Sequence, residues 1–373
     1  MLLRARCGPL EMSSNHKPPS PSATLARAGV QDIADALGIS CGTVDRALHN
    51  RPGVSPATKR KVLVEARRLG YRPNLAARYL SSRKHLTIGV SLPLEVAYFF
   101  DDVREGIVEA ASAYEPLGVK ILYRPYKRFG QHEVEALRDI LEEDISGLVV
   151  APAYHERLRG DIERATRRGI PVVCVVSDAP GTERLTSVSV DPFTNGALAG
   201  ELMSHLLAGE GGVIVFIGMH AVVDHEQKLR GFESSLKRFC PRSKILGVIE
   251  AHDEEDEAYQ KCRKVFGQYP SAKGIYIATA NSIPVMRALD EMGLAGKIKV
   301  IGTDLFPAMV PFIEAGKISA TIHQRPREQG LTAVRTIVRF LTEGLRPAPQ
   351  IPLDPAIVMR SNLGLFFREP QRE

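Results

Sequence analysis

Short runs of β-branched residues alternate with helical stretches along most of this 373-residue chain, and this alternation restricts the possible folds more than any other feature. In the first half, the runs lie at residues 86–90, 119–123, 147–151 and 171–176. The helical stretches lie at residues 101–113, 133–141 and 155–168. Parallel strands need long crossover connections, which helices normally supply. The pattern therefore predicts an α/β fold in which a parallel sheet carries helices on both faces.

The same alternation starts again in the second half and predicts a second α/β lobe. Its helices are expected at residues 197–207, 225–238, 255–266 and 282–292. Its strands are expected at residues 212–217, 245–250, 274–278 and 298–302. Residues 190–194 link the lobes, and a run at 320–324 with a helix at 328–342 is expected to return to the first lobe. Two lobes joined in this way predict a ligand cleft at the carboxyl ends of the strands.

Ahead of the lobes, residues 30–48 predict two short helices joined by a tight turn. Gly38 can take the left-handed conformation that ends a helix, and Ser40 is expected to cap the second one. A helix-turn-helix presents its second helix to the major groove of DNA. The residues available for this contact are Cys41, Gly42, Thr43, Asp45 and Arg46. Buried helix pairs in enzymes show the same pattern, so this run alone leaves both interpretations open.

The residues that follow favour the DNA-binding interpretation. Ser55 is expected to cap a third helix over residues 57–69, with Pro56 at its first position, and a further short helix is expected at 75–80. The whole run resembles the DNA-binding head of the LacI/GalR-type (lac-repressor) family of bacterial transcription regulators. The matching residues are Asp32, Ile33, Ala34, Gly38, Ile39, Ser40, Thr43, Val44, Arg46, Val54, Ser55, Thr58, Val62, Gly70, Tyr71, Pro73, Asn74, Ala77, Arg78 and Leu80.

This resemblance implies roles for residues of the head and of the hinge after it. Arg46 falls where the family contacts DNA from its recognition helix, and its guanidinium can donate two hydrogen bonds to guanine O6 and N7. Cys41 and Gly42 occupy the positions that vary with specificity. Leu80 matches the leucine that the family inserts into a minor-groove step, with Ala77 beside it, although ordinary linker packing is the alternative. The remaining expected DNA-binding residues are Thr43, Asp45, Asn74 and Arg78.

The charge distribution agrees with a DNA-binding head. Residues 24–85 carry twelve Lys and Arg residues against four Asp and Glu residues, although the whole chain has a net charge of only +6. The chain after His85 is therefore net acidic. A basic head on an acidic body is typical of nucleic-acid-binding proteins, with a solvated charged face as the alternative.

Composition and the cysteines predict a cytoplasmic protein. No run of 18 apolar residues is present, so no transmembrane helix is expected. Residues 1–23 are rich in Ser and Pro, are predicted to be disordered, and lack the apolar core of a secretory signal. Met12 is a candidate start. The five scattered cysteines indicate free thiols rather than disulfides or a zinc site.

From residue 86 to about 362 the chain resembles the type-I periplasmic-binding-protein fold, particularly its ribose-type sugar-binding branch. Sugar sites combine carboxylates and amides for hydroxyls with aromatic rings for C–H faces. The residues expected in the cleft are Phe99, Phe100, Ser177, Asp178, Glu226, Asn281, Asp304 and Gln324. Asp304 and Gln324 fall where that branch keeps a sugar-binding Asp and Gln, whereas Asn281 is equally suited to cap the following helix.

The chain also departs from that branch. Asp191-Pro192 stands in place of Asp-Asn, Ser177-Asp178 in place of an Asp-Arg pair, and His225-Glu226-Gln227-Lys228 where the branch has an Arg. The expected pocket is rich in carboxylates, which suits a sugar, a polyol or a cationic ligand better than a sugar phosphate. The acidic run at residues 252–257 is expected to be the solvated start of a helix rather than a metal site.

These observations predict a cytoplasmic, ligand-responsive transcription regulator. It is expected to act as a repressor and as a homodimer on a pseudo-palindromic, double-stranded operator, with a sugar or polyol as effector and no membrane partner. The alternative is a solute-binding module of a sugar transport system. No cofactor, metal or catalytic motif is predicted, so no enzyme is expected.

The sequence also predicts how the chain is divided. The expected parts are an extension at 1–23, the helix-turn-helix domain at 24–70, a hinge at 71–86, a ligand-binding domain at 87–362 and a tail at 363–373. Within the ligand-binding domain, lobe 1 is expected at about 87–190 and 323–350, and lobe 2 at about 192–320.

Overall fold

A computed structural model describes residues 29–48, 52–69, 85–128 and 130–366. The chain divides into a small unit, Met1–Asn74, and a large unit, Leu75–Glu373, and each is described here by itself. The predicted N-terminal extension and the hinge residues Asn74, Ala77, Arg78 and Leu80 lie outside the described residues.

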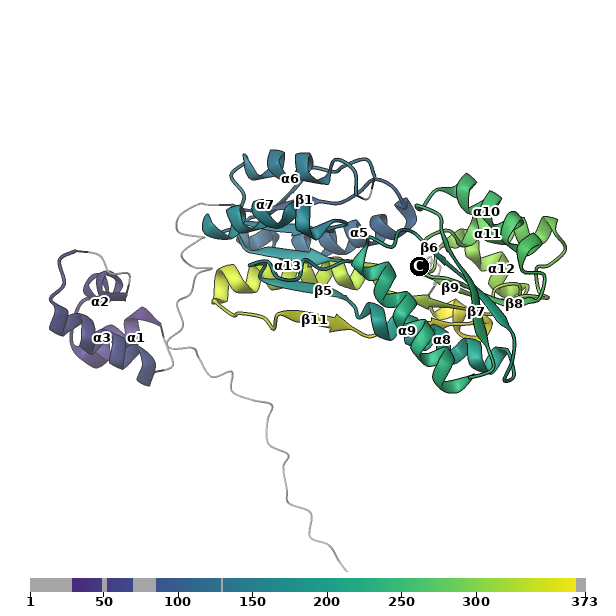
Figure 1. The fold of residues 1–373 in the computed structure, drawn as a ribbon. Helices are drawn as coiled ribbons and strands as arrows, with labels where there is room; N and C mark the ends of the chain where they lie inside the picture. Colours follow the sequence, from purple (N-terminus) through teal and green to yellow (C-terminus); the bar gives the residue numbers. More distant parts are fainter. Residues whose placement is uncertain (1–28, 49–51, 70–84, 129, 367–373) are drawn as a thin grey trace, which may run out of the picture. The chain divides into compact units, whose positions relative to one another are not determined.

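The small unit is a three-helix head that forms where the sequence predicts it (Figure 1). Its helices are α1 (Val30–Leu37), α2 (Cys41–Leu48) and α3 (Pro56–Arg68). Gly38 ends α1 in the left-handed conformation, with φ 63°, and the Ser55 side chain caps α3 by accepting a hydrogen bond from the Thr58 N–H at 3.1 Å. The core residues are Ile33, Ala34, Val44, Ala47, Val62 and Ala66. This apolar face is the one that helical periodicity predicts.

The large unit contains two sheets of parallel strands, which confirms the predicted α/β class. The first sheet has the order β11-β5-β4-β3-β1-β2. Its strands are β1 (Leu86–Ser91), β2 (Val119–Tyr123), β3 (Gly147–Val150), β4 (Val172–Val175), β5 (Thr186–Val190) and β11 (Gln350–Leu353). Its helices are α5 (Ala97–Ala113), α6 (Glu133–Leu141), α7 (His155–Arg167) and α13 (Pro326–Glu343).

The second sheet has the order β12-β10-β9-β8-β6-β7, and β12 alone is antiparallel among its described strands. Its strands are β6 (Gly212–Ile217), β7 (Lys244–Glu250), β8 (Ala272–Ile277), β9 (Lys299–Thr303), β10 (Ala320–His323) and β12 (Ala356–Val358). The helices of this lobe are α8 (Pro192–Leu206), α9 (Val223–Phe239), α10 (Glu255–Gln268), α11 (Ser282–Glu291) and α12 (Val310–Glu314). Short 3₁₀ turns lie at Glu115–Leu117, Pro307–Met309 and Arg360–Leu365.

Alternate residues of the central strands pack on opposite layers of helices. Leu148 and Val150 of β3 pack with α6 and α7, whereas Val149 packs with α5 and α13. In the second lobe, Phe216 of β6 packs with α10 and α11, whereas Val215 packs with α8 and α9. Because both faces of each sheet are buried, the central strands β3, β4 and β6 are apolar throughout rather than alternating.

Each lobe also contains one pair of helices that pack backbone against backbone. A Cβ at Gly106 of α5 would lie 2.0 Å from the carbonyl oxygen of Arg327 in α13, and one at Gly330 would lie 2.1 Å from that of Val103. In the second lobe, a Cβ at Gly196 of α8 would lie 1.8 Å from the carbonyl oxygen of Lys228 in α9. Only glycine allows these approaches.

The chain crosses between the lobes three times within the described residues. The crossings follow β5, β10 and β11, at Asp191, Gln324 and Asp354. The return of helix α13 to the first lobe is as expected, but the sequence did not indicate strands β11 and β12. Both are short strands at sheet edges. None of the described helices is long and apolar enough to cross a membrane.

Candidate functional site

In the head, helix α2 turns Val44 and Ala47 into the core, and of the expected DNA-contact residues Cys41 also packs against this core. Gly42 and Arg46 are exposed one helical turn apart, while Cys41 donates its Sγ–H to Gln31 Oε1 at 3.0 Å. The hydroxyls of Ser40 and Thr43 are hydrogen-bonded at 2.9 Å. Arg46 is therefore the long cationic side chain that α2 offers to a groove.

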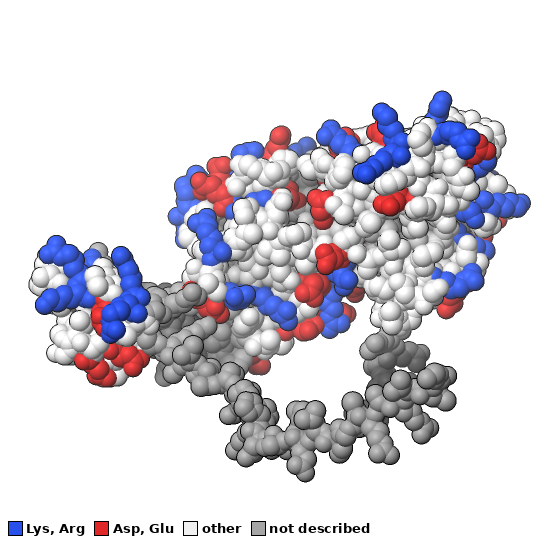
Figure 2. All heavy atoms as spheres, turned by 90° about the horizontal axis from the view of Figure 1, so that it is seen from below, with Lys and Arg blue, Asp and Glu red and all other residues white. Residues whose placement is uncertain are grey.

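Basic side chains also gather on one side of the head. Figure 2 shows blue atoms over one face of the small unit and red atoms on the opposite side. Exposed members of α3 include Arg60, Lys61 and Arg67, whereas Arg68 binds Glu65. Unpaired surface cations neutralise DNA phosphates and give salt-dependent affinity.

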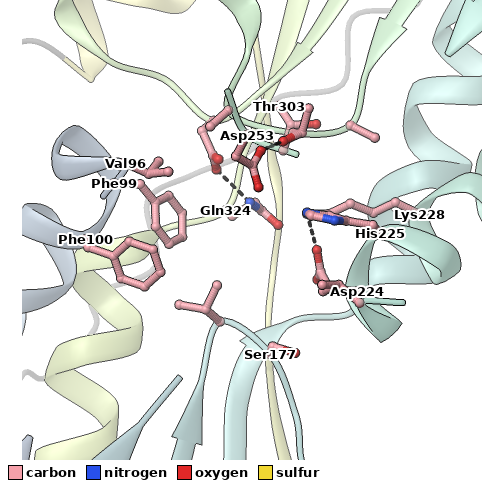
Figure 3. A pocket seen from close by; sticks show the side chains of 16 residues that line it. Val96, Phe99, Phe100, Ser177, Asp224, His225, Lys228, Asp253, Thr303 and Gln324 are labelled. Carbon is pink, nitrogen blue, oxygen red and sulfur yellow. Dashed lines mark hydrogen bonds and ion pairs between the residues drawn. The ribbon is translucent and has the colours of Figure 1, made fainter. Parts of the chain in front are cut away.

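In the large unit, a pocket lies between the carboxyl ends of the two sheets (Figure 3). The first lobe lines it with Val96, Phe99, Phe100, Val176 and Ser177. The second lobe lines it with Val222, Asp224, His225, Lys228, Asp253, Ala278, Thr279, Ala280, Thr303 and Asp304, and Gln324 comes from a crossing segment. The pocket encloses about 540 Å³, including the solvent that opens into it.

A chain of hydrogen bonds holds Asp304 and Gln324 in place. Gln324 Nε2 donates to Asp304 Oδ1 at 2.7 Å, and Gln324 Oε1 accepts from Asn195 Nδ2 at 3.3 Å. The Tyr276 hydroxyl donates to Asn195 Oδ1 at 3.3 Å, and Gln329 Nε2 donates to the Gln324 carbonyl at 2.9 Å. Gln324 therefore cannot rotate without breaking buried hydrogen bonds, so the pocket is preorganised on this side.

Charges in the pocket are concentrated on the second lobe. Lys228 Nζ lies 2.6 Å from Asp224 Oδ2, and both side chains are buried. The Thr279 hydroxyl donates to Asp253. Burial raises the pKa of Asp304 to about 6; the charges of Asp224 and Asp253 also raise it, whereas Lys228 and the Gln324 hydrogen bond lower it. Three carboxylates thus face one ammonium group.

Backbone strain is concentrated around the pocket. Eight non-glycine residues in the described parts of the chain have a positive φ, and four of them line the pocket. They are Val96 at 53°, Val176 at 69°, Asp253 at 55° and Asp304 at 69°. A β-branched residue in this region is a true outlier, and such residues persist where the surrounding structure holds them, often at binding sites.

Several contacts join the lobes around the pocket. The Tyr98 ring of α5 stacks on Phe306 of the second lobe with centroids 3.7 Å apart, and its hydroxyl donates to the Ala280 carbonyl at 2.7 Å. Arg128 of the first lobe binds Glu254 of the second. The lobes are therefore closed on each other in this structure.

The structure brings together five of the eight expected ligand residues: Phe99, Phe100, Ser177, Asp304 and Gln324. The other three do not line the pocket. Asp178 binds Arg184 and lines a neighbouring groove instead, and Glu226 binds Arg230 at 2.9 Å. Asn281 is buried at the start of α11, but its side chain makes no capping hydrogen bond, and its Nδ2 has no hydrogen-bond partner in the described structure.

The sequence interpretation missed Asp224, His225, Lys228 and Asp253. Asp224 and Lys228 are spaced i, i+4, which places them on one face of α9, whereas Glu226 is turned roughly half a rotation away. Helical spacing could therefore have identified the pair. Asp253 was included in a run expected to be solvated, but it lies in the segment between β7 and α10 and lines the pocket.

Comparison with known proteins identifies the family. The model for the periplasmic binding protein domain matches residues 88–345, and that for bacterial regulatory proteins of the lacI family matches residues 29–74. The chain belongs to the lacI family of bacterial regulatory proteins. The two matches coincide with the two parts described above, the three-helix head and the two-lobed body.

Individual relatives agree with this family. The chain is 27% identical over 337 residues to the HTH-type transcriptional regulator GntR of Escherichia coli (strain K12), covering 86% of this chain and 94% of that protein. It is 27% identical over 286 residues to the ribose operon repressor of Bacillus subtilis (strain 168), covering 75% and 82%. The body has the fold of a Burkholderia graminis C4D1M solute-binding protein crystallised with D-arabinose, with a TM-score of 0.70, 22% identity, and coverage of 75% and 97%.

Proposed function

We propose that this protein is a transcription regulator whose affinity for a DNA operator is controlled by a sugar or polyol bound between the two lobes. The observation that carries the proposal is a polar pocket with aromatic walls, at the strand ends of a periplasmic-binding-protein body, in one chain with a lacI-family head. The head separates it from the alternative, a solute-binding module of a transport system. The relatives are named as regulators and sugar-binding proteins, so binding without turnover is proposed.

The pocket residues suit a polyhydroxylated ligand. Asp304 and Gln324 offer carboxylate and amide groups to hydroxyls, and Phe99 and Phe100 offer aromatic faces to the C–H surface of the ring. Asp178, Glu226 and Asn281 remain candidates for supporting contacts only, because they do not line the pocket.

The coupling of ligand to DNA follows from linkage. A ligand that binds the closed lobes more tightly than the open ones shifts their population. If the hinge residues Asn74, Ala77, Arg78 and Leu80 bind DNA in one of these states only, the ligand changes operator affinity, and the operator changes ligand affinity by the same factor. We further propose that the protein acts in the cytoplasm as a homodimer on a pseudo-palindromic operator, most simply as a repressor.

Selection of duplexes from a random pool by the purified full chain, at near-physiological salt, tests this function. The expected result is an inverted repeat, because a two-fold dimer reads two equivalent half-sites. Arg46→Ala is expected to abolish the preference while salt-dependent nonspecific binding stays largely intact, since a bidentate base contact contributes about 1–3 kcal/mol of discrimination. Arg67→Ala removes the same charge from the exposed surface of α3 and is the matched control. Equal selectivity of Arg46→Ala and the unmodified protein would contradict the role of Arg46, and selection of no sequence would contradict the proposed function.

A further inference from the structure

The charged groups of the pocket are distributed unevenly between the lobes. The first lobe contributes apolar and aromatic side chains with the Ser177 hydroxyl, and the pocket-lining charges all come from the second lobe. They are the carboxylates of Asp224, Asp253 and Asp304 and the ammonium of Lys228. His225 Nδ1 lies 3.0 Å from the Met219 backbone nitrogen and 3.3 Å from the Met219 carbonyl oxygen, so this ring nitrogen is engaged with the backbone.

Lys228 forms an ion pair with one of the three carboxylates, that of Asp224. Its Nζ lies 2.6 Å from Asp224 Oδ2, with side-chain exposures of 4% and 11%, so this pair is shielded from water. A buried ion pair of this kind is costly to break, because each partner would be left as an isolated buried charge. Asp253 and Asp304 therefore form no ion pair within the described structure. The charge of Lys228 does lower the pKa of Asp304, but the pocket still holds three carboxylates against one ammonium group.

Each of these two carboxylates has one oxygen that is engaged and one that is not. Asp253 Oδ1 accepts from the Thr279 hydroxyl, and Asp304 Oδ1 accepts from Gln324 Nε2, both neutral donors. Within the described structure, Oδ2 of each residue accepts no hydrogen bond. Asp304 lines the pocket and is only 7% exposed, so its carboxylate is largely shielded from bulk water. Figure 3 shows Asp253 and Gln324 on the same side of the pocket, opposite the two phenylalanine rings.

Burying a carboxylate that forms no ion pair is unfavourable, and a second carboxylate at the same site repels it. The charge of Asp253 in fact contributes to the raised pKa of Asp304. A neutral hydroxyl would satisfy the free oxygens but would leave the charge. An ammonium group provides both hydrogen bonds for the free oxygens and a charge of opposite sign, because it carries a positive charge and three N–H donors.

We propose that the effector carries a protonated amine on a hydroxylated carbon frame, as an amino sugar or amino polyol does, with the ammonium group bound by Asp253 and Asp304. This rests on the proposed function, and it narrows the sugar or polyol to a cationic member of that class. Sugar acids and sugar phosphates fit this pocket poorly, because they would add negative charge where three carboxylates already face one ammonium group.

Calorimetric titration of the full chain at neutral pH tests this with matched compounds. The probes are D-glucose, D-galactose and D-mannose, their 2-amino-2-deoxy analogues, and the corresponding uronates. An amino sugar is expected to bind about tenfold more tightly than its parent, because its ammonium adds a positive charge to the hydrogen bond with the carboxylate; tenfold corresponds to about 1.4 kcal/mol. The uronates are expected to show no binding.

A pair of variants then assigns the effect to the pocket. Asp253→Asn keeps the size and the acceptor for Thr279 but removes one charge, so it is expected to reduce the preference for the amine over its parent about tenfold. Asp256→Asn removes an equivalent charge from the exposed surface of α10 and is the control. If Asp253→Asn does not fold, the comparison of amine and parent on the unmodified protein still decides the question.

The outcomes separate this inference from the proposed function. Equal or tighter binding of a parent hexose would overturn the inference and leave the proposed sugar-responsive regulator intact. Binding of none of the compounds would overturn the inference together with the sugar-binding part of the proposed function. Selection of an operator tests the DNA-binding part independently in both cases.

Discussion

Replacing Asp304 by Asn is expected to stabilise the ligand-free protein at neutral pH while it weakens ligand binding. In the folded protein, burial raises the pKa of the Asp304 carboxyl from its ordinary 3.8 to about 6, and the charges of Asp224 and Asp253 act in the same direction. Lys228 and the hydrogen bond from Gln324 oppose this shift without cancelling it. The negative charge of Asp304 thus lowers the stability of the folded protein when no ligand is bound.

The sign and size follow from proton linkage. Between about pH 4 and pH 6 the folded state binds more protons at Asp304 than the unfolded chain does, so the free energy of unfolding falls as pH rises through this window. A difference of about two pKa units corresponds to about 3 kcal/mol, lost in full above the folded pKa. Asn is neutral at every pH and can still accept the Gln324 hydrogen bond. Asp304→Asn is therefore expected to gain up to about 3 kcal/mol near pH 7 and almost nothing near pH 4.

Urea unfolding followed by far-ultraviolet circular dichroism, repeated across this pH range without ligand, measures the effect. Asp139→Asn, an exposed carboxylate on α6, is the control and should follow the unmodified protein. The reasoning is refuted if Asp304→Asn is less stable than the unmodified protein at neutral pH. It is equally refuted if the variant keeps the same dependence of stability on pH.

Other substitutions test the packing and the closure of the lobes. Gly106→Ala is expected to destabilise the body by about 1–3 kcal/mol in thermal unfolding, because the new methyl would overlap a carbonyl of α13. Gly160→Ala in α7, where no atom lies within 4 Å of the added Cβ, should instead gain about 0.5–1 kcal/mol, and equal effects of the two would contradict the packing argument. Tyr98→Phe removes the hydrogen bond to the Ala280 carbonyl but keeps the ring, so ligand affinity is expected to fall about two- to tenfold. Unchanged affinity in titration would show that this bond does not contribute to closure.

Local patterns in the sequence determined the elements of both units. Gly38 ends α1 and Ser55 caps α3 as predicted, because helix ends depend on the chemistry of one or two neighbouring residues. The alternation of strands and helices could equally be predicted from the sequence, since buried parallel strands form short, largely apolar runs. Asp304 and Gln324 could be placed in the pocket because the carboxyl ends of parallel strands meet at one edge of a sheet.

Only the tertiary structure decided which other polar side chains reach the pocket and which charges remain unpaired there. Whether α9 turns Lys228 or Glu226 inward depends on how α9 packs against α8, and that contact is set by Gly196, far away in the sequence. Asp178 does not line the pocket, and its carboxylate forms an ion pair with Arg184 instead. The edge strands β11 and β12 escaped prediction because their pairing partners lie in distant segments. Helix ends and strand alternation are local in the chain, whereas the balance of charge in the pocket depends on which distant segments fold together.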